Sequence, residues 1–234
     1  MNPDIPALCI RDLRFSYPEN RFRLDVEQLD LAAGERASLV GESGSGKTTL
    51  LQLLSGIMAP ESGSIRTCGT ELAGLGDAGR RAFRISTVGL VFQEFELLDY
   101  LTVVENVLLP YRIHGALRLD SGVRNRAAEL LEELALDGLA QRRPRQLSHG
   151  QRQRVAVCRA LITNPSLLLA DEPTANLDRE NRQRVLATFE RHVREKQAAM
   201  IIATHDDDVQ SHVDRCLDLK ELFKPSTGGK YHVG

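Results

Sequence analysis

Apolar side chains occupy every second position through much of residues 7–31, on both sides of a turn at 17–20. Period-two spacing is typical of strands that bury one face. A turn between two such stretches indicates that the chain reverses its direction there. We therefore expect antiparallel strands that lie beside the main core.

Short apolar runs follow at wider spacing. They lie at residues 37–40, 88–92, 167–170 and 200–204. Runs of this length are typical of strands buried on both faces, as in a parallel sheet. Residues 63–67 resemble a return strand, and Asp77 is in position to cap a short helix that runs through Phe83. We interpret the run at 200–204 as the last strand of the core.

Between the runs at 88–92 and 167–170, the apolar side chains recur at helical spacing. Residues 101–113 have apolar side chains at helical spacing, with an expected kink at Pro110. Residues 120–136 are amphipathic. Another helix begins at Ser148, which forms a capping-box pair with Gln151 three residues later. The pattern predicts a helical lobe inserted into an α/β core.

The segment after the first core strand carries the most specific chemical signal. Residues 41–49 match G-x-x-x-x-G-K-[ST], a loop that wraps the phosphates of a nucleoside triphosphate. Glycines let successive N–H groups face an anion, Lys47 brings a positive charge to the β- and γ-phosphates, and the Thr48 hydroxyl can bind Mg²⁺. A strand precedes the loop and a helix N-terminus follows it, as phosphate binding requires. The predicted phosphate-binding residues are Gly41, Glu42, Ser43, Gly44, Ser45, Gly46, Lys47, Thr48 and Thr49.

Polar side chains follow the later core strands, at the carboxyl ends where open α/β sheets bind ligands. Gln93 follows one strand, Asp171 and Glu172 follow the next, and His205 follows the last. The first acid suits Mg²⁺, and the second can accept a proton from an attacking water. Gln93 and His205 are weak signals by themselves, because single polar residues at such places are often structural. Tyr17 can stack on a purine ring, although its spacing alone favours a packing role.

Composition limits the remaining possibilities. The chain has 234 residues, a formal net charge of −2 and 42% hydrophobic residues, which suits one larger domain or a core with an inserted lobe. This charge gives no electrostatic reason to expect nucleic acid as a partner. The four cysteines are far apart, which excludes the usual zinc spacings and favours a reduced, cytoplasmic environment. We see no secretion signal, and no apolar run approaches the ~20 residues that cross a bilayer, so a membrane role would need another chain.

In their order, these motifs resemble those of the nucleotide-binding subunits of ATP-binding-cassette (ABC) transporters, over nearly the whole chain. The matching set is Tyr17, the loop at 41–49, Gln93, residues 147–151, Asp171, Glu172, residues 175–178 and His205. The resemblance implies the α/β fold of a P-loop NTPase core with a mostly parallel sheet, an antiparallel β subdomain and an inserted α-helical subdomain. It implies a single domain over residues 1–234, with 1–93 and 166–234 in the core and about 94–165 in the helical subdomain.

The resemblance also implies roles and cofactors. ATP and Mg²⁺ would be bound, with Tyr17 stacked on adenine. Glu172 would be the general base, and His205 would hold the γ-phosphate and the attacking water, with Gln93 as the third catalytic position. The metal and its waters would be held by Thr48, Gln93 and Asp171.

A second copy of the chain is an implied partner. The remaining cofactor-binding positions implied by the family are Ser148, His149, Gly150, Gln151 and Asp178. The segment at 147–151 would close over the ATP of the other copy, because a helix that starts at Ser148 directs its N–H groups and positive dipole end outward. The family usually has Leu-Ser-Gly-Gly-Gln here, so His149 is a departure. We interpret it as a tolerated variant that keeps its backbone N–H, the alternative being a site impaired by the larger ring.

Residues 92–98, 102–107 and 173–178 are most similar to ABC ATPases of lipoprotein-release and macrolide-efflux type, which move a long periplasmic part of a membrane partner. The implied function is an ATP-hydrolysing subunit that dimerises on ATP and drives a separate transmembrane permease. Through that partner it would lie at the cytoplasmic face of the membrane. Two alternatives stay open: an amino-acid importer ATPase, and an ATP-dependent regulatory clamp without transport. A clamp on nucleic acid is not favoured, since those proteins usually carry two cassettes or a long coiled-coil insertion.

Overall fold

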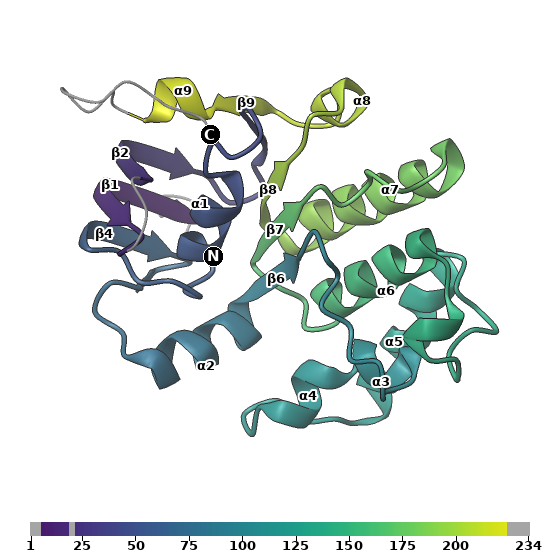
Figure 1. Cartoon of the computed structure of the whole chain (residues 1–234). Coiled ribbons are helices and arrows are strands. Elements are labelled where there is room, and N and C mark those ends of the chain that lie inside the picture. Colours follow the sequence, from purple (N-terminus) through teal and green to yellow (C-terminus); the bar gives the residue numbers. More distant parts are fainter. Residues whose placement is uncertain (1–5, 19–21, 224–234) are drawn as a thin grey trace.

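The computed structural model describes residues 6–18 and 22–223, and Figure 1 shows two sheets with helices around them. The strands are β1 (Leu8–Ser16), β2 (Arg23–Leu31), β3 (Arg36–Val40), β4 (Ser62–Thr67), β5 (Thr70–Glu71), β6 (Val88–Val91), β7 (Leu167–Asp171), β8 (Ala199–Ala203) and β9 (Arg215–Asp218). Within the described residues they form a four-stranded sheet, in the order β2-β1-β4-β5, and a five-stranded sheet, in the order β6-β7-β8-β3-β9.

The four-stranded sheet is antiparallel, as the period-two spacing predicts. β1 pairs with β2 in a register that places Leu8 opposite Leu31 and Phe15 opposite Leu24, and all four of these side chains are buried. β4 pairs with the other edge of β1. The predicted turn at 17–20 lies partly outside the described residues.

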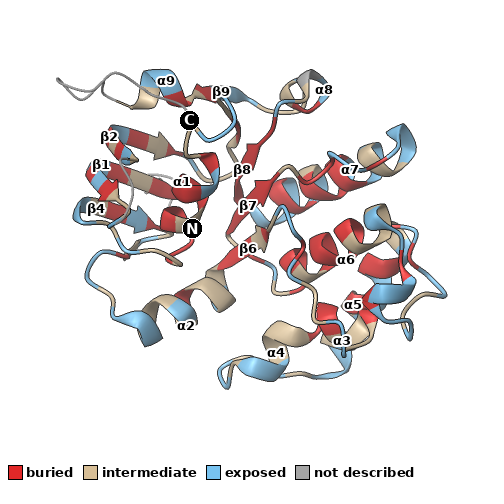
Figure 2. Ribbon diagram, viewed as in Figure 1, coloured by how far each residue is buried: buried red, intermediate tan, exposed pale blue. Residues whose placement is uncertain are grey.

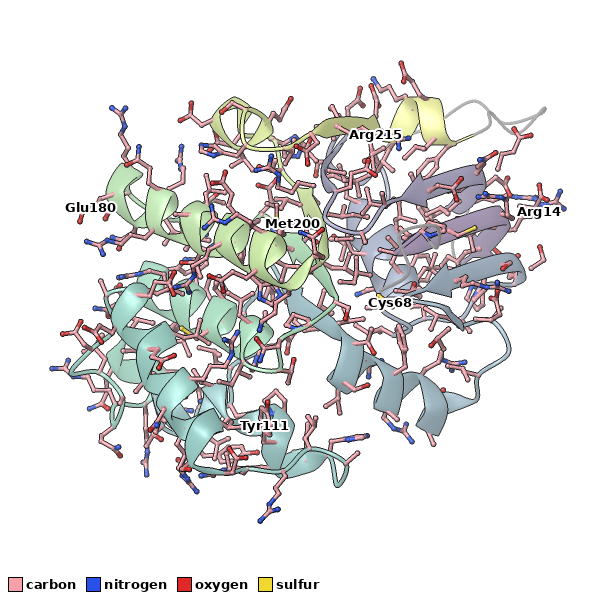
Figure 3. The ribbon with its side chains drawn as sticks, turned by 180° about the vertical axis from the view of Figure 1, so that it is seen from behind. Arg14, Cys68, Tyr111, Glu180, Met200 and Arg215 are labelled. Carbon is pink, nitrogen blue, oxygen red and sulfur yellow. The ribbon has the colours of Figure 1, made fainter. Side chains whose placement is uncertain are left out.

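The five-stranded sheet is parallel and covered on both faces. Successive residues of β7 and β8 alternate between two apolar clusters, so that Leu169 and Ile201 face one cluster while Leu168 and Met200 face the other. This double burial explains the uninterrupted apolar runs. Figure 2 shows the buried strands at the centre of the molecule, and Figure 3 places Met200 inside, with Glu180 at the exposed start of the helix that follows β7.

The run at 200–204 is not the last strand of the core, which corrects the sequence prediction. β9 pairs in parallel with β3, with Ala37 opposite Arg215 and Val40 opposite Asp218. Its residues Arg215 and Cys216 are exposed. An edge strand has one unpaired side, so it does not need the apolar run that reveals a central strand.

The helices are α1 (Lys47–Leu54), α2 (Asp77–Thr87), α3 (Val103–Val107), α4 (Leu109–Ile113), α5 (Ser121–Glu133), α6 (His149–Leu161), α7 (Arg179–Lys196), α8 (Asp207–Gln210) and α9 (Leu219–Leu222), with a 3-10 turn at Pro144–Gln146. Helices α3–α6 lie together on one side of β6, β7 and β8, and the antiparallel sheet lies on the opposite side (Figure 1). Among the described residues, no helix has the length and apolar character needed to cross a membrane.

Two helix predictions need correction. Asp77 is the first residue of α2 rather than its cap, the cap position is Gly76, and the helix continues to Thr87. The expected kinked helix at 101–113 is two short helices, and Pro110 lies in the first turn of the second one. Proline is accepted there because the first helical N–H groups have no intrahelical partner. The amphipathic α5 and the capping box of α6 are confirmed.

Candidate active site

A cavity of about 890 Å³ lies where the carboxyl ends of the parallel strands meet. Its lining includes the predicted residues Tyr17, Ser43, Gly44, Ser45, Gly46, Lys47, Thr48, Thr49, Gln93, Asp171, Glu172 and His205. These residues come from the segment just after β1, the loop after β3, the first turn of α1, and the segments at the ends of β6, β7 and β8. Because the strands of a parallel sheet all end at one edge, residues far apart in the chain share one cavity.

The loop after β3 presents an uncapped helix end to this cavity. Gly46 is the N-cap of α1, with a left-handed φ of 102°, and no side chain caps the helix. An L-residue with a Cβ is strained at this φ, which explains the glycine. The first N–H groups of a helix have no intrahelical partner. Here no side chain supplies one, so they are available to an anion.

Lys47 is bent back over the same loop. Its Nζ donates to the carbonyl oxygens of Gly41 at 2.7 Å and Glu42 at 3.1 Å. Gly41 and Glu42 therefore hold the lysine through their backbones. The Glu42 carboxylate points elsewhere, to Lys220 at 2.6 Å. The positive charge of Lys47 is thus held beside the loop amides.

Thr48 and Asp171 form the metal-binding candidate. Thr48 Oγ1 donates to Asp171 Oδ2 at 2.5 Å, and Gln93 lines the same cavity. Hydroxyl, carboxylate and amide oxygens fit Mg²⁺, which keeps waters and phosphate oxygens in the rest of its shell and needs only one or two carboxylates. No three His, Cys, Asp or Glu side chains gather into a metal-binding group in the described residues.

Glu172 has the properties of a base. Burial is the main cause that raises its pKa above the ordinary 4.5, and the nearby His205 and Lys47 oppose the rise. A raised pKa makes the carboxylate a better proton acceptor near neutral pH. Its Oε1 is buried without a hydrogen-bond partner, and its Oε2 accepts only a long bond of 3.4 Å from Thr204.

His205 lies between the base and the lysine. Its Nε2 is 3.1 Å from Lys47 Nζ and 3.7 Å from Glu172 Oε1. The His205 ring therefore lies close enough to contact a group bound between Lys47 and Glu172.

Tyr17 both packs and lines the cavity. Its ring meets Phe15 edge-on at 5.0 Å between centroids and lies 5.9 Å from Phe22, while its hydroxyl is 3.1 Å from Thr49 Oγ1. The two interpretations of this tyrosine are therefore compatible. Phe22 also lines the cavity and was not predicted. A phenylalanine in an alternating strand pattern looks like an ordinary core residue, so its position gave no signal.

Arg182 and Asp206 are two further cavity residues that were not predicted, whereas Ala175 and Asn176, which also line the cavity, belong to the matching motif at 175–178. Arg182 Nη1 contacts Asp206 Oδ2 at 2.8 Å. Asp206 directly follows His205, so its place at a strand end was a usable signal. Arg182 is one of several arginines on α7, and nothing in the sequence distinguishes it from the others.

Ser148, His149, Gly150 and Gln151 do not line the cavity. They begin α6, where Ser148 Oγ accepts from the Gln151 N–H at 3.2 Å and Gln151 Oε1 accepts from the Ser148 N–H at 2.9 Å. The exposed His149 ring lies edge-on against Phe95, with 4.6 Å between centroids. Asp178 is also outside the cavity and caps α7 by accepting from the Asn181 N–H at 2.8 Å.

Comparison with known proteins gives the family. The model of the ABC transporter family matches residues 24–175. The lipoprotein-releasing system ATP-binding protein LolD of Chromohalobacter salexigens is 42% identical over 204 residues, which is 87% of this chain and 85% of the relative. The ABC transporter ATP-binding protein YtrE of Bacillus subtilis is 42% identical over 78% of each chain. A dimeric ATP-binding cassette solved in a post-hydrolysis state with ADP and Pi has a TM-score of 0.82 and 30% identity, over 90% of this chain and 93% of that one.

Proposed function

The chain belongs to the ABC transporter family as one of its ATPase subunits, and from this premise we propose that two copies close around ATP to drive a separate membrane subunit. One observation supports the dimer above all. The cavity holds Lys47, Thr48, Asp171, Glu172 and His205 but lacks the signature segment at 147–151. That segment begins a helix whose exposed end is available to the nucleotide of a second copy.

In this proposal the amides of the loop and Lys47 bind the β- and γ-phosphates of ATP. Mg²⁺ held by Thr48, Asp171 and Gln93 would neutralise charge that develops on the phosphates. Glu172 accepts a proton from a water that attacks the γ-phosphorus, the bond from that phosphorus to the β–γ bridging oxygen breaks, and ADP and phosphate leave. His205 orients the water and the γ-phosphate.

The names of the relatives support the choice of membrane partner. Several relatives about 40% identical over most of the chain are lipoprotein-releasing system ATP-binding proteins. We therefore take the lipoprotein-release type as the function, with the subunit bound at the cytoplasmic face of the membrane through its permease. The helical subdomain at about 94–165 would be the inserted part of this single domain. The second candidate is an amino-acid importer ATPase, because such ATPases share much of the motif pattern of this chain.

ATP-driven dimerisation is tested with the purified chain. We expect phosphate release per protein molecule to rise with protein concentration, because each site needs two copies, and to stop when EDTA removes Mg²⁺. Sedimentation should show monomers without nucleotide and dimers with ATP when hydrolysis is blocked by Glu172→Gln. Turnover that is independent of protein concentration, together with monomers under all conditions, contradicts the dimer.

The transport type is tested by identifying the products of the neighbouring genes and copurifying them with this chain. A permease with four helices and a large extracytoplasmic domain should copurify and make phosphate release depend on an acylated lipoprotein in the vesicle. If phosphate release responds instead to an amino acid with its binding protein, the importer is correct.

A further inference from the structure

Gln153 is a buried polar residue on α6 that contacts the backbone of Glu172. Only 1% of its surface is exposed, and its Nε2 donates to the Glu172 carbonyl oxygen at 2.8 Å. The two residues are 19 positions apart, and α6 and the end of β7 are separate elements. The bond therefore joins the helix of the signature segment to the residue proposed as the base.

The backbone of Glu172 needs such a bond. Glu172 has a φ of 47°, in the left-handed region that non-glycine residues seldom adopt. Its N–H is held by the Ala203 carbonyl at 2.9 Å, and its carbonyl is held by Gln153, with a second and longer contact of 3.4 Å from the Ala175 N–H. Removing Gln153 leaves the carbonyl side of this strained residue with the long contact alone.

The side chain of Glu172 cannot make up the loss. Its Oε1 has no hydrogen-bond partner, and its Oε2 has the bond of 3.4 Å from Thr204. The direction of the carboxylate is therefore set mainly by the backbone from which it projects. A small rotation of that backbone moves the proton acceptor, and misplacement by about 1 Å can cost roughly 10²-fold in rate.

A space-filling role does not explain Gln153. Its Oε1 is buried without a hydrogen-bond partner, which costs free energy that an apolar side chain of similar size avoids. The neighbouring buried positions of α6, such as Val155, Val157 and Leu161, are apolar. Arg154 and Gln153 are the polar exceptions among the buried residues of α6, and the one satisfied side-chain contact of Gln153 is the one to Glu172.

We propose that Gln153 is a positioning residue that holds the Glu172 backbone, and so its carboxylate, in the hydrolysing arrangement of its own copy. Gly150 lies one turn earlier on the same face of α6, where a Cβ would meet the Asn176 carbonyl oxygen and Leu177 at 3.2 Å. This face packs within the chain, against the segment that follows Glu172. The start of the helix at Ser148 instead faces outward, toward the second copy.

This inference rests on the proposed ATPase dimer, and its first test uses Gln153→Met. Methionine keeps the length of the side chain and removes the donor. We expect kcat to fall roughly 10-fold, while KM for ATP stays within about twofold because the phosphate-binding residues are untouched. Gln183→Met on the exposed side of α7 is the matched control. Unchanged kcat in Gln153→Met, in a protein whose wild type hydrolyses ATP and dimerises, overturns the inference but leaves the function standing.

Mixed dimers separate positioning from a general disturbance of α6. In the first pair, one copy carries both Gln153→Met and Glu172→Gln and the other copy is wild type. Only the wild-type copy can hydrolyse ATP, and its nucleotide faces the altered α6 of the other copy. In the reverse pair, one copy carries only Gln153→Met and the other carries only Glu172→Gln. The copy that can hydrolyse ATP is therefore the one with the altered α6. We expect the loss only in the second pair. A loss in the first pair shows that the altered helix acts on the partner's nucleotide, and a loss there as large as in the second pair overturns the inference.

Gln153→Glu is a second variant of the same shape, useful if the methionine variant does not fold. Its carboxylate cannot donate to the Glu172 carbonyl, but its protonated form can. Its kcat relative to wild type should rise as the pH falls from 9 to 6. A ratio that does not change with pH contradicts the proposed bond.

Discussion

The amino-terminal ends of α1 and α6 both offer helix amides to an anion, but they are built in different ways. The start of α1 follows the left-handed Gly46, has no side-chain cap and lies in the cavity. The start of α6 is capped by its own side chains, since Ser148 and Gln151 satisfy one another, and it lies outside the cavity. Two of the four amides at this end are thereby satisfied, which leaves those of His149 and Gly150 for a ligand.

The surroundings of the two helix ends differ as well. At α1 a lysine, a hydroxyl–carboxylate pair and the half-buried Glu172 carboxylate lie around the loop. At α6 the capping box keeps the helix stable while its end is exposed to solvent. In the proposed dimer, the first end binds a nucleotide within one chain, whereas the second contacts a nucleotide held by the other copy. We therefore expect changes at α1 to act on binding and chemistry, and changes at α6 to act on closure of the dimer.

Glu172→Gln should give the largest effect. It removes the proton acceptor beside the first helix end and leaves both ends intact, so turnover should slow by roughly 10²–10⁴ while ATP binding persists. Dimers should accumulate with ATP. Phosphate release and sedimentation measure the two parts separately, and turnover at the wild-type rate would show that another group is the base.

Lys47→Ala should weaken binding itself. In the proposed site the lysine is the charged partner of the phosphates, and loss of a charged hydrogen bond of about 1.5–3 kcal/mol corresponds to roughly a 10- to 150-fold loss of affinity. Calorimetric titration with ATP measures it, with the exposed Lys196→Ala as the control. Unchanged affinity refutes the role given to this end of α1.

Ser148→Ala tests the other end. Loss of an N-cap costs about 0.5–2 kcal/mol. We expect a small decrease in Tm and normal ATP binding by the monomer, but weaker dimers in the Glu172→Gln background. Asp120→Ala removes the cap of α5, another helix of 13 residues, and should lower Tm without weakening the dimer. If Ser148→Ala and Asp120→Ala dimerise equally well, the start of α6 has no special role in closing the dimer.

The raised pKa of Glu172 predicts a smaller, pH-dependent effect on stability. Because the pKa in the folded state lies above the ordinary 4.5, protonation favours the folded state. Above the folded-state pKa of Glu172, the charged carboxylate lowers the free energy of unfolding of the wild type. This loss of stability disappears as the pH falls below the ordinary pKa of the carboxyl group. Glu172→Gln should therefore have the higher Tm at pH 7, and the difference should vanish near pH 4. A Tm difference that is constant over this range contradicts the shift.

His149→Gly should give the smallest effect. The ring lies on Phe95 in the loop that follows Gln93, and an aromatic pair of this kind contributes about 0.5–1.5 kcal/mol. The backbone N–H remains, so we expect dimerisation and turnover to stay within about threefold of wild type. Steady-state phosphate release measures this. A loss well beyond threefold would make His149 a required part of the signature segment rather than a tolerated variant.

Much of the site could be read from residues that are close in the sequence. The loop at 41–49, the acids after an apolar run and the capping box of α6 each depend on neighbours within a few positions, and the geometry of strands and helix starts transmits those short-range patterns directly. The parallel strands were visible because burial on both faces requires unbroken apolar runs. The amino-acid sequence by itself therefore places Lys47, Thr48, Asp171, Glu172 and His205 at one edge of a sheet.

Contacts between separate elements depend on the tertiary structure alone. β9 has no apolar run, and Arg182 is one arginine of several on its helix. Gln153 is the clearest case, because a glutamine on an amphipathic helix reads as a solvent-facing residue. Its burial follows from the close approach of α6 to the segment after β7, and its partner is a backbone carbonyl, which any residue at that position would provide. Sequence patterns identify side chains, whereas a bond of this kind is decided by where two backbones meet.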